Sequence, residues 1–213
     1  MLKLRHRRRL YLFYDEVKAL QNKKTLSVRA IVFIGVFAAL DIVLTRPFRT
    51  LGAPFNFGFV AIATAGTFFG PVYGAFTALV SDILGYLLFP QTKPYFPGYA
   101  ITAVSRALVY AFLFYRNPVM HLSKDTKLFA WCKAVALCVI ASGLNITINL
   151  FTLPLWQVIT SGTYQSYWFF VLKRIPNSLL FWGIQIVTLP LLMRYLAPLR
   201  EKYAPESIRL RKV

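Results

Sequence analysis

The sequence predicts an all-α integral membrane protein with six transmembrane helices. Its 213 residues are 57% hydrophobic and only 15% charged, and the mean hydropathy is +0.55. A soluble domain of this length could not bury so much apolar surface. The hydrophobic residues also gather into segments, most of them near the roughly 20 residues that a helix needs to cross a bilayer.

Six apolar segments are expected to form one membrane domain, residues 28–193. The second segment is too short to cross a bilayer unaided, and the Gly70-Pro71 pair that follows it allows only a tight turn. Neighbouring helices should therefore shelter it. The predicted helices are 28–45, 57–69, 71–89, 98–115, 129–153 and 168–193.

The charged residues are strongly unbalanced, with 25 Lys plus Arg, 7 Asp plus Glu and a formal net charge of +18. In a soluble protein this excess would suggest a nucleic-acid surface, but the apolar segments argue against that, and we expect a lipid bilayer and no nucleic acid as partner. Basic residues cluster before the first segment, around the fourth connection and after residue 193. The positive-inside rule then predicts that both termini are cytoplasmic.

Two basic segments flank the membrane domain. Residues 1–27 form an amphipathic extension, either a helix on the cytoplasmic membrane surface or a frayed tail, and residues 194–213 form a cytoplasmic tail. Some cations instead fall on or near the outer face, where the connecting loops hold no acidic residue to neutralise them. Lipid head groups or a carboxylate-bearing solute could be their partners. These cations are Arg46, Arg49, Lys93, Lys173 and Arg174.

Two charged residues lie inside apolar helices, Asp82 in the third and Arg106 in the fourth. A charge within a span costs roughly 2.5–3.5 kcal/mol even on insertion scales, so each is expected to line a cavity or find a partner. They could form a buried pair that locks the two helices together, or they could contact a ligand. Asp41 near the outer end of the first helix could pair with an arginine or touch a ligand.

The last two helices concentrate side chains with amide groups. Asn145 and Asn149 are four residues apart on the fifth helix, and Arg174, Asn177 and Gln185 share a broad face of the sixth. Such residues often only join helices to one another. Together with aromatic residues at the outer ends of the helices, these amides predict a site that could stack on a flat ring and form hydrogen bonds with its edge. Most of these aromatic residues, however, are expected to be anchors at the membrane interface.

Signatures of catalysis are missing from the sequence. It holds no GxxxxGK[ST] phosphate loop, no HExxH and no GxSxG, so we expect no enzyme, no ATPase activity of this chain alone and no cofactor. His6 and His121 are interpreted as solvated, and Cys132 and Cys138 as apolar filling without a disulfide or a metal. Small residues four apart, Gly35 with Ala39 and Gly74 with Ala78, predict close helix packing within the chain or docking of another membrane protein.

Several stretches resemble one family. FGPVYGAFTALVSDILGYLLFP followed by YFPGYAITAVSRALVYAF, the NFGF entry to the second helix and KRIPNSLLFWGIQ in the last are similar to the folate-specific substrate-binding subunits (S components) of energy-coupling-factor (ECF) vitamin transporters. The likeness runs from about residue 28 to residue 193. It implies a six-helix folate-binding subunit in a bacterial cytoplasmic membrane. It also implies a transmembrane coupling subunit and two cytoplasmic ATPases as partners, with Gly35 and Ala39 docking on the coupling subunit.

The resemblance also implies a ligand and a mechanism. The loaded subunit would topple in the membrane as the partner ATPases use ATP, delivering folate to the cytoplasm. We expect Asn145, Asn149, Asn177 and Gln185 to contact the pterin edge. Ring stacking is assigned to Phe57, Tyr95, Phe96 and Trp168, and carboxylate binding to Arg46, Lys93, Lys173 or Arg174. The first loop, RPFRTLGAPFNFG, departs from the pattern expected for the family at Ala53-Pro54-Phe55-Asn56.

Two alternatives remain open at this point. A sister S component for riboflavin, pantothenate or another solute would keep the fold and the coupling but change the pocket. A membrane enzyme or lipid-handling protein would use Asp82 and Arg106 in chemistry, but the sequence offers no nucleophile-and-base constellation for it.

Overall fold

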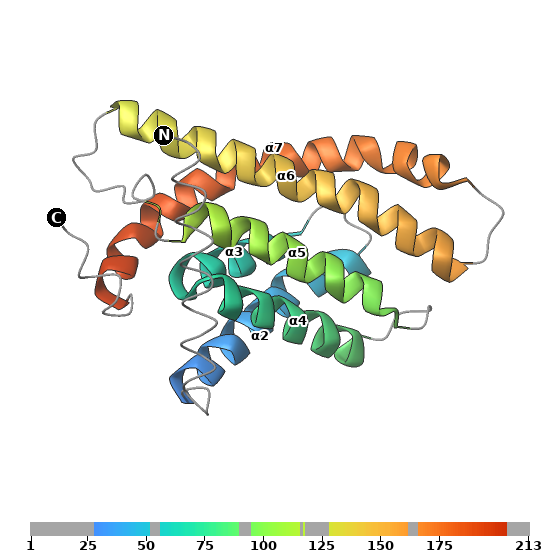
Figure 1. Cartoon of the computed structure of the whole chain (residues 1–213), viewed down its shortest axis with the longest axis horizontal. Coiled ribbons are helices and arrows are strands. Elements are labelled where there is room, and N and C mark those ends of the chain that lie inside the picture. Colours follow the sequence, from blue (N-terminus) through green and yellow to red (C-terminus); the bar gives the residue numbers. More distant parts are fainter. Residues whose placement is uncertain are drawn as a thin grey trace, which may run out of the picture.

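Within the residues that this computed structural model describes, 28–51, 56–89, 95–115, 117, 128–161 and 166–203, all regular secondary structure is helical. The predicted fold class is confirmed to that extent. The helices are α2 (Val28–Thr50), α3 (Gly58–Phe69), α4 (Pro71–Leu88), α5 (Pro97–Phe114), α6 (Leu128–Ser161) and α7 (Tyr167–Tyr203), drawn in Figure 1. The predicted segment 1–27, with His6, lies outside the described residues, as do Lys93, His121 and residues 204–213 of the predicted tail 194–213.

Among the described helices, five are long and apolar enough to cross a membrane, and α3, with 12 residues, is the short apolar exception. Ten of its 12 residues are buried. Its neighbours α2, α4, α5 and α7 all contact it. The prediction that the short second helix is sheltered by other helices is confirmed.

Three helices end later than the sequence predicted. α2 runs through Pro47 to Thr50 and α6 runs through Pro154 to Ser161, while α7 continues ten residues beyond residue 193. A proline removes one backbone hydrogen bond and clashes with the preceding turn, but such losses are tolerated in membrane helices when neighbouring groups satisfy the backbone. The prediction that the fifth helix stops before Pro154 is therefore wrong.

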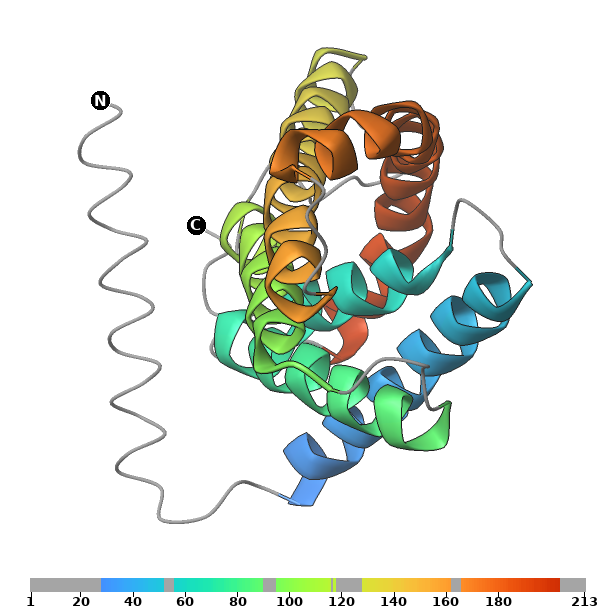
Figure 2. The same cartoon turned by 90° about the vertical axis from the view of Figure 1, so that its right-hand side faces the viewer.

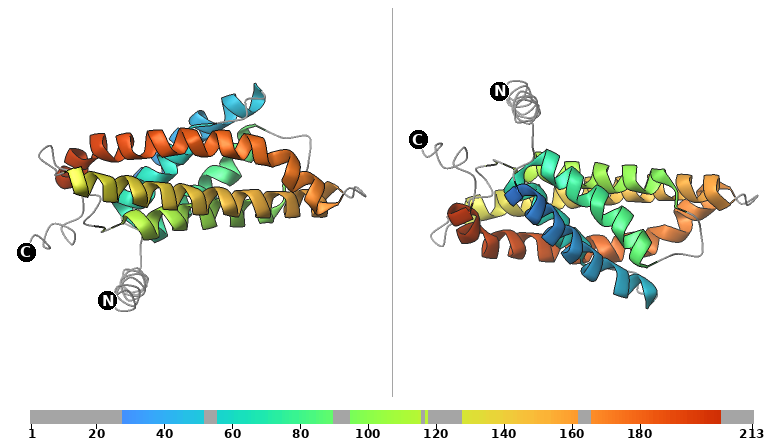
Figure 3. Two further views of the ribbon diagram at one scale, coloured as in Figure 1. Left: turned by 90° about the horizontal axis from the view of Figure 1, so that it is seen from above. Right: turned by 90° about the horizontal axis from the view of Figure 1, so that it is seen from below.

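The helices form two groups that meet along α5. In the first group α4 packs on α2, α3 and α5, and α3 packs on α2 and α5. In the second, α6 and α7 form an antiparallel pair that contacts α5 through α6 and contacts α3 only slightly through α7 (Figure 2). Figure 3 shows α2 and α4 crossing the α6–α7 pair obliquely. Phe59 of α3 meets Phe181 of α7 edge to face, with ring centroids 5.7 Å apart.

Small residues bring α3, α4 and α5 close together. A Cβ added to Gly66 would lie 3.1 Å from the Cβ of Ala111, and one added to Gly74 would lie 3.1 Å from the Cα of Gly66. Gly74 and Ala78 are buried, so of the alternatives for this pair, packing within the chain is the one observed. Gly35 and Ala39 are exposed instead.

Candidate functional site

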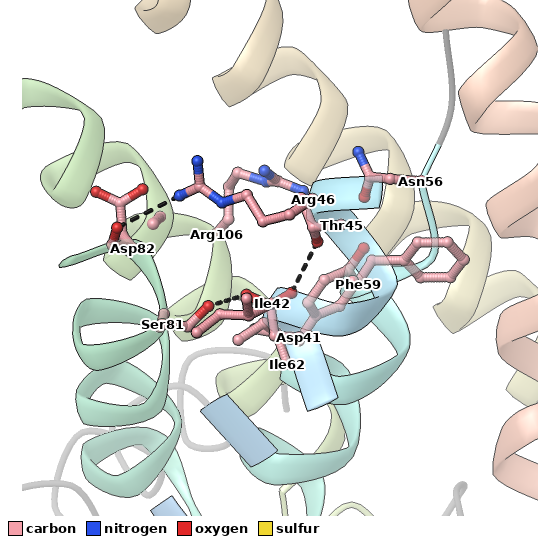
Figure 4. Close-up of a pocket in the computed structure, with 14 residues that line it drawn as sticks. Asp41, Ile42, Thr45, Arg46, Asn56, Phe59, Ile62, Ser81, Asp82 and Arg106 are labelled. Carbon is pink, nitrogen blue, oxygen red and sulfur yellow. Dashed lines mark hydrogen bonds between the residues drawn. The ribbon is translucent and has the colours of Figure 1, made fainter. Parts of the chain in front are cut away.

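A polar cavity lies between α2, α3, α4 and α5, with a volume of about 90 Å³. Pockets for drug-sized ligands measure about 300–1,000 Å³, so a ligand of that size would place only one end here or would widen the cavity. Figure 4 shows its charged and polar side chains. The lining comprises Asp41, Ile42, Thr45, Arg46, Asn56, Gly58, Phe59, Ile62, Ala78, Ser81, Asp82, Ala103, Arg106 and Tyr110.

Asp41 is held by hydroxyl groups from two helices. Thr45 Oγ1, one turn further along α2, donates to Asp41 Oδ1 at 3.2 Å, and Ser81 Oγ of α4 donates to Asp41 Oδ2. A Cβ at Gly58 would collide with both Asp41 and Thr45. The start of α3 can therefore cover this carboxylate only because residue 58 has no side chain.

Arg46 spans the gap from α2 to α4. It is only 6% exposed, and its Nη2 donates to the backbone oxygen of Asp82 at 3.4 Å. A Cβ at Gly85 would lie 2.5 Å from that Nη2, so the bare backbone at residue 85 leaves room for the guanidinium. Sequence reasoning placed Arg46 on or near the outer face, and the structure buries its side chain in the cavity wall.

Asp82 is contacted from the loop that precedes α5. Tyr95 Oη donates to Asp82 Oδ2 at 3.3 Å. Burial, with the nearby Asp82 carboxylate, raises the pKa of the Tyr95 hydroxyl, so this group stays protonated and remains a donor at neutral pH. Tyr95 also packs against Tyr86, with ring centroids 5.2 Å apart.

Arg106 is fixed by an amide of α6. Its Nε donates to Asn145 Oδ1 at 2.7 Å, and Asn145 Nδ2 donates to the backbone oxygen of Arg106 at 3.2 Å. Asn145 is fully buried. Because both bonds join the same two residues, the orientation of the Arg106 side chain depends on Asn145. Asp82 and Arg106 line the same cavity from adjacent helices.

A tyrosine of the cavity lining is hydrogen-bonded to a glutamine that lies outside this lining. Tyr110, one turn beyond Arg106, donates its hydroxyl to Gln185 Oε1 of α7 at 2.9 Å. Gln185 is 0% exposed. Within the described part of the chain, its Nε2 and the Oδ1 of Asn149 are buried without a hydrogen-bond partner. A buried unsatisfied polar group costs about 1–3 kcal/mol, so both atoms can gain from a ligand or a water molecule.

The other predicted ligand residues that the structure describes are absent from the cavity lining. Phe57 packs edge to face on Phe48 with centroids 5.4 Å apart, and Phe96 packs on Trp156 at 5.6 Å. Trp168 is 61% exposed. Lys173 and Asn177 are exposed and Arg174 is half-buried on α7.

Sequence reasoning overlooked several residues that line the cavity. Thr45 and Ser81 donate hydrogen bonds to Asp41, and Tyr110 is part of the lining. Helical spacing held part of the signal, because Thr45 is four residues after Asp41 and Tyr110 is four residues after Arg106. The glycines that make room, Gly58 and Gly85, carried no such signal, since their role depends on which side chain comes from another helix.

Comparison with known proteins gives one family and several relatives. A family model described as "ECF transporter, substrate-specific component" matches residues 29–193. A protein named "Folate transporter FolT" from Clostridium novyi is 34% identical over 95 residues, which cover 43% of this chain and 54% of that protein. The chain therefore matches only about half the length of this relative.

Two further relatives match over greater lengths. A second protein named "Folate transporter FolT", from Leuconostoc mesenteroides, is 25% identical over 167 residues, 76% of this chain and 82% of that protein. A solved structure described as "Crystal structure of FolT bound with folic acid" has a TM-score of 0.61 and 23% identity, covering 79% of this chain and 94% of that one. At this identity the structural match speaks for the fold alone.

Proposed function

The chain belongs to the substrate-specific components of ECF transporters, and from that premise we propose that it is the folate-binding subunit of an ATP-driven importer. It is a multi-pass membrane protein. The bacterial cytoplasmic membrane is its proposed location. Support for folate comes from the names of its two relatives and from the chemistry of the cavity.

The observation that carries this proposal is the cluster of charged side chains that line one cavity among α2, α4 and α5. Charged side chains in a membrane domain are costly and mark substrate pathways when they face an interior cavity. Asp41, Arg46 and Arg106 all line such a cavity here. Folate offers groups for both signs, because its pterin ring carries donors and acceptors and its glutamate carries two carboxylates.

We extend the proposal to residues that contact the ligand. Arg46 borders the cavity directly, and the partnerless amide atoms of Asn149 and Gln185 are supported as contacts by their burial. Arg174 is a further candidate at the outer end of α7. The remaining expected contacts stay predictions, and these are Phe57, Lys93, Tyr95, Phe96, Asn145, Trp168, Lys173 and Asn177.

The proposed topology has six membrane-embedded helices and both termini in the cytoplasm. The second of them, α3, would lie in the membrane among its neighbours, because its 12 residues reach only about 18 Å at 1.5 Å per residue. The basic residue distribution supports the orientation. Labelling of single cysteines at each end with a membrane-impermeant reagent, in a variant without Cys132 and Cys138, tests it, and outward-facing termini would contradict it.

The partners are a coupling subunit and two ATPases, as for the family. The chain itself is proposed to use no cofactor and to hydrolyse no ATP, while its partners use ATP to make the loaded subunit topple. Gly35 and Ala39 support a docking role for α2, because both are exposed and a Cβ at Gly35 would meet nothing within 4 Å.

Calorimetric titration of the purified chain in detergent tests the ligand. Folate, riboflavin, thiamine and pantothenate are titrated against the wild type, Arg46→Ala and Arg194→Ala. Folate binding that Arg46→Ala weakens by about tenfold or more is the expected result. Arg194→Ala is the control because it also removes one cation. Arg194 lies over Trp131 at 5.6 Å and is not part of the cavity lining, so its loss should leave the affinity for folate unchanged.

Two outcomes would contradict the folate assignment. Binding of another vitamin with no folate binding would keep the family and replace the substrate. If the monodisperse, folded chain binds none of the four vitamins, the proposed function is wrong.

A further inference from the structure

An arginine and a tryptophan meet where the apolar part of α6 begins and that of α7 ends. The apolar span of α6 starts at Trp131, and that of α7 ends at Leu196. These two positions lie at the same end of the bundle (Figure 1), and the guanidinium carbon of Arg194 lies over the Trp131 ring, 5.6 Å from its centre. Both side chains are therefore at the membrane boundary, the depth of the lipid head groups.

The contact with the ring leaves the hydrogen-bonding groups of Arg194 available. A cation–π contact uses the charge of a guanidinium but none of its five N–H donors. Arg194 is exposed, and its donors make no hydrogen bond to any residue that the structure describes. Of the acidic side chains, the structure describes only Asp41 and Asp82, which line the polar cavity. Among the described residues, Arg194 therefore has a ring beneath it but no carboxylate partner.

The face of α7 that carries Arg194 continues into the membrane as an apolar strip. Val187, Leu191 and Arg194 are spaced by four and three residues, as on one helix face. Val187 is 60% exposed and Leu191 is 46% exposed. At 1.5 Å per residue the strip reaches about 10 Å from Arg194 along the helix. This face thus presents a cation at the boundary and apolar side chains directly beside it.

From these observations we infer that the α6–α7 corner, formed by Trp131, Val187, Leu191 and Arg194, binds an anionic phospholipid. Arg194 donates to the phosphate of the head group, because the planar fork of a guanidinium matches two phosphate oxygens. One acyl chain lies along the apolar strip. Under the proposed topology the corner faces the cytoplasmic leaflet, where basic pockets between helices bind anionic head groups.

Two related ligands fit the α6–α7 corner less well. A soluble phosphate ester would satisfy the arginine but leave the apolar strip uncovered. A zwitterionic phospholipid carries its own cation close to the phosphate, and that cation is repelled by the basic surroundings of a chain with a formal net charge of +18. The inference does not depend on which vitamin the chain binds.

Native mass spectrometry of the full chain in detergent tests the inference. Dioleoyl-phosphatidylglycerol and dioleoyl-phosphatidylcholine, which differ only in the head group, are titrated into wild type, Arg194→Gln and Lys133→Gln. Lys133 is the matched control, because it is an exposed cation near the same boundary. It is two residues from Trp131 and so lies on a different side of α6.

Wild type should bind phosphatidylglycerol at least about fivefold more tightly than phosphatidylcholine. Arg194→Gln should weaken phosphatidylglycerol binding by about fivefold, and Lys133→Gln by less than about twofold. Equal losses in the two variants would show a diffuse basic surface in place of a site. Equal affinities of wild type for the two lipids would refute the anionic ligand.

Competition with sn-glycerol 3-phosphate in excess distinguishes a lipid from a soluble phosphate ester. Binding of phosphatidylglycerol should be unchanged, because the ester cannot cover the apolar strip. Displacement of the lipid by the ester would overturn the inference.

A second variant covers the case in which Arg194→Gln does not fold. Arg194→Lys keeps the charge but loses the planar fork, and it should weaken phosphatidylglycerol binding severalfold. Unchanged binding would contradict the assigned phosphate contact. Folate titration of each folded variant should give the wild-type affinity, so a failure of lipid binding stays distinct from a failure of the proposed function.

Discussion

Two glycines control where the charged side chains of the cavity can lie. Gly58 leaves space for Asp41 and Thr45, and Gly85 leaves space for the guanidinium of Arg46. Each glycine lies in a helix at a point where that helix packs against α2. A methyl group at either position would displace a charged group of the cavity lining, and a charge is costly to place elsewhere in a membrane domain.

Gly85→Ala is predicted to weaken folate binding by about tenfold, because its Cβ would lie 2.5 Å from Arg46 Nη2 and one misplaced charge-assisted hydrogen bond is worth about that factor. Calorimetric titration measures the effect. Gly183→Ala is the control, since a Cβ there meets nothing within 4 Å. Equal affinities for the two variants would contradict the role given to Gly85.

Asn145 is a positioning residue in this structure. It holds Arg106 by two hydrogen bonds and is absent from the cavity lining. The sequence predicted a contact between Asn145 and the ligand, and the geometry offers a second route by which this residue could affect binding, through Arg106.

Asn145→Ala, Arg106→Ala and the double variant separate these two routes. If Asn145 acts through Arg106, the double variant should bind folate no more weakly than Arg106→Ala alone, because residues that share one interaction are not additive. Asn145→Ala alone is expected to cost about tenfold in affinity. Fully additive losses in titration would instead support direct contact of Asn145 with the ligand.

At the scale of helices, α3 is the element on which the cavity depends. It supplies Phe59 and Ile62 to the lining and is buried along most of its length. Small residues at its contacts with α4 and α5 replace the hydrophobic driving force that is absent between helices in lipid. One of these contacts is between Gly66 and Ala111, where a Cβ added to Gly66 would lie 3.1 Å from the Cβ of Ala111.

Gly66→Ala is predicted to destabilise the protein, because the added Cβ would lie 3.1 Å from the Cβ of Ala111 and 3.3 Å from its backbone nitrogen. Overpacking of this kind costs about 1–3 kcal/mol. Gly183→Ala brings the same gain in helix propensity without the contact. Thermal unfolding in detergent should give a lower Tm for Gly66→Ala than for Gly183→Ala, and the reverse order would refute the packing argument.

At the scale of the whole molecule, α2 has one face in the cavity and another available to a partner. Asp41 and Arg46 face inward, while Gly35, Val36, Ala39 and Leu40 are exposed. The same helix could therefore report ligand binding to a coupling subunit docked on its outer face, as the proposed transport cycle requires.

Gly35→Leu is predicted to abolish uptake while leaving binding intact. In cells that carry the coupling subunit and the ATPases, uptake of labelled folate should fall by at least about tenfold, since a branched side chain blocks the close helix approach that small residues permit. Titration of the purified variant should match the wild type. Gly183→Leu, at another exposed glycine with no Cβ neighbour, should retain uptake, and unchanged uptake by Gly35→Leu would argue against docking at this face.

By itself, the sequence determined the class of the molecule and the positions of its helices. Hydrophobicity is a local property, so the apolar segments and the short second helix could be located directly. Asp82, Arg106 and Asp41 could be singled out as interior residues because a charge in a span needs a cavity or a partner. The family resemblance followed from local stretches as well, and the match over residues 29–193 confirms it.

Only the tertiary structure decided how these residues combine. Hydrophobic pattern does not say which helices are neighbours, so Asn145 could be placed on a polar face but its bonds to Arg106 could not be foreseen. The burial of Arg46 against Gly85 depends likewise on two helices meeting at one point. Contacts between distant parts of the chain arise from packing, and that is why the cavity with its balanced charges is a property of the folded bundle.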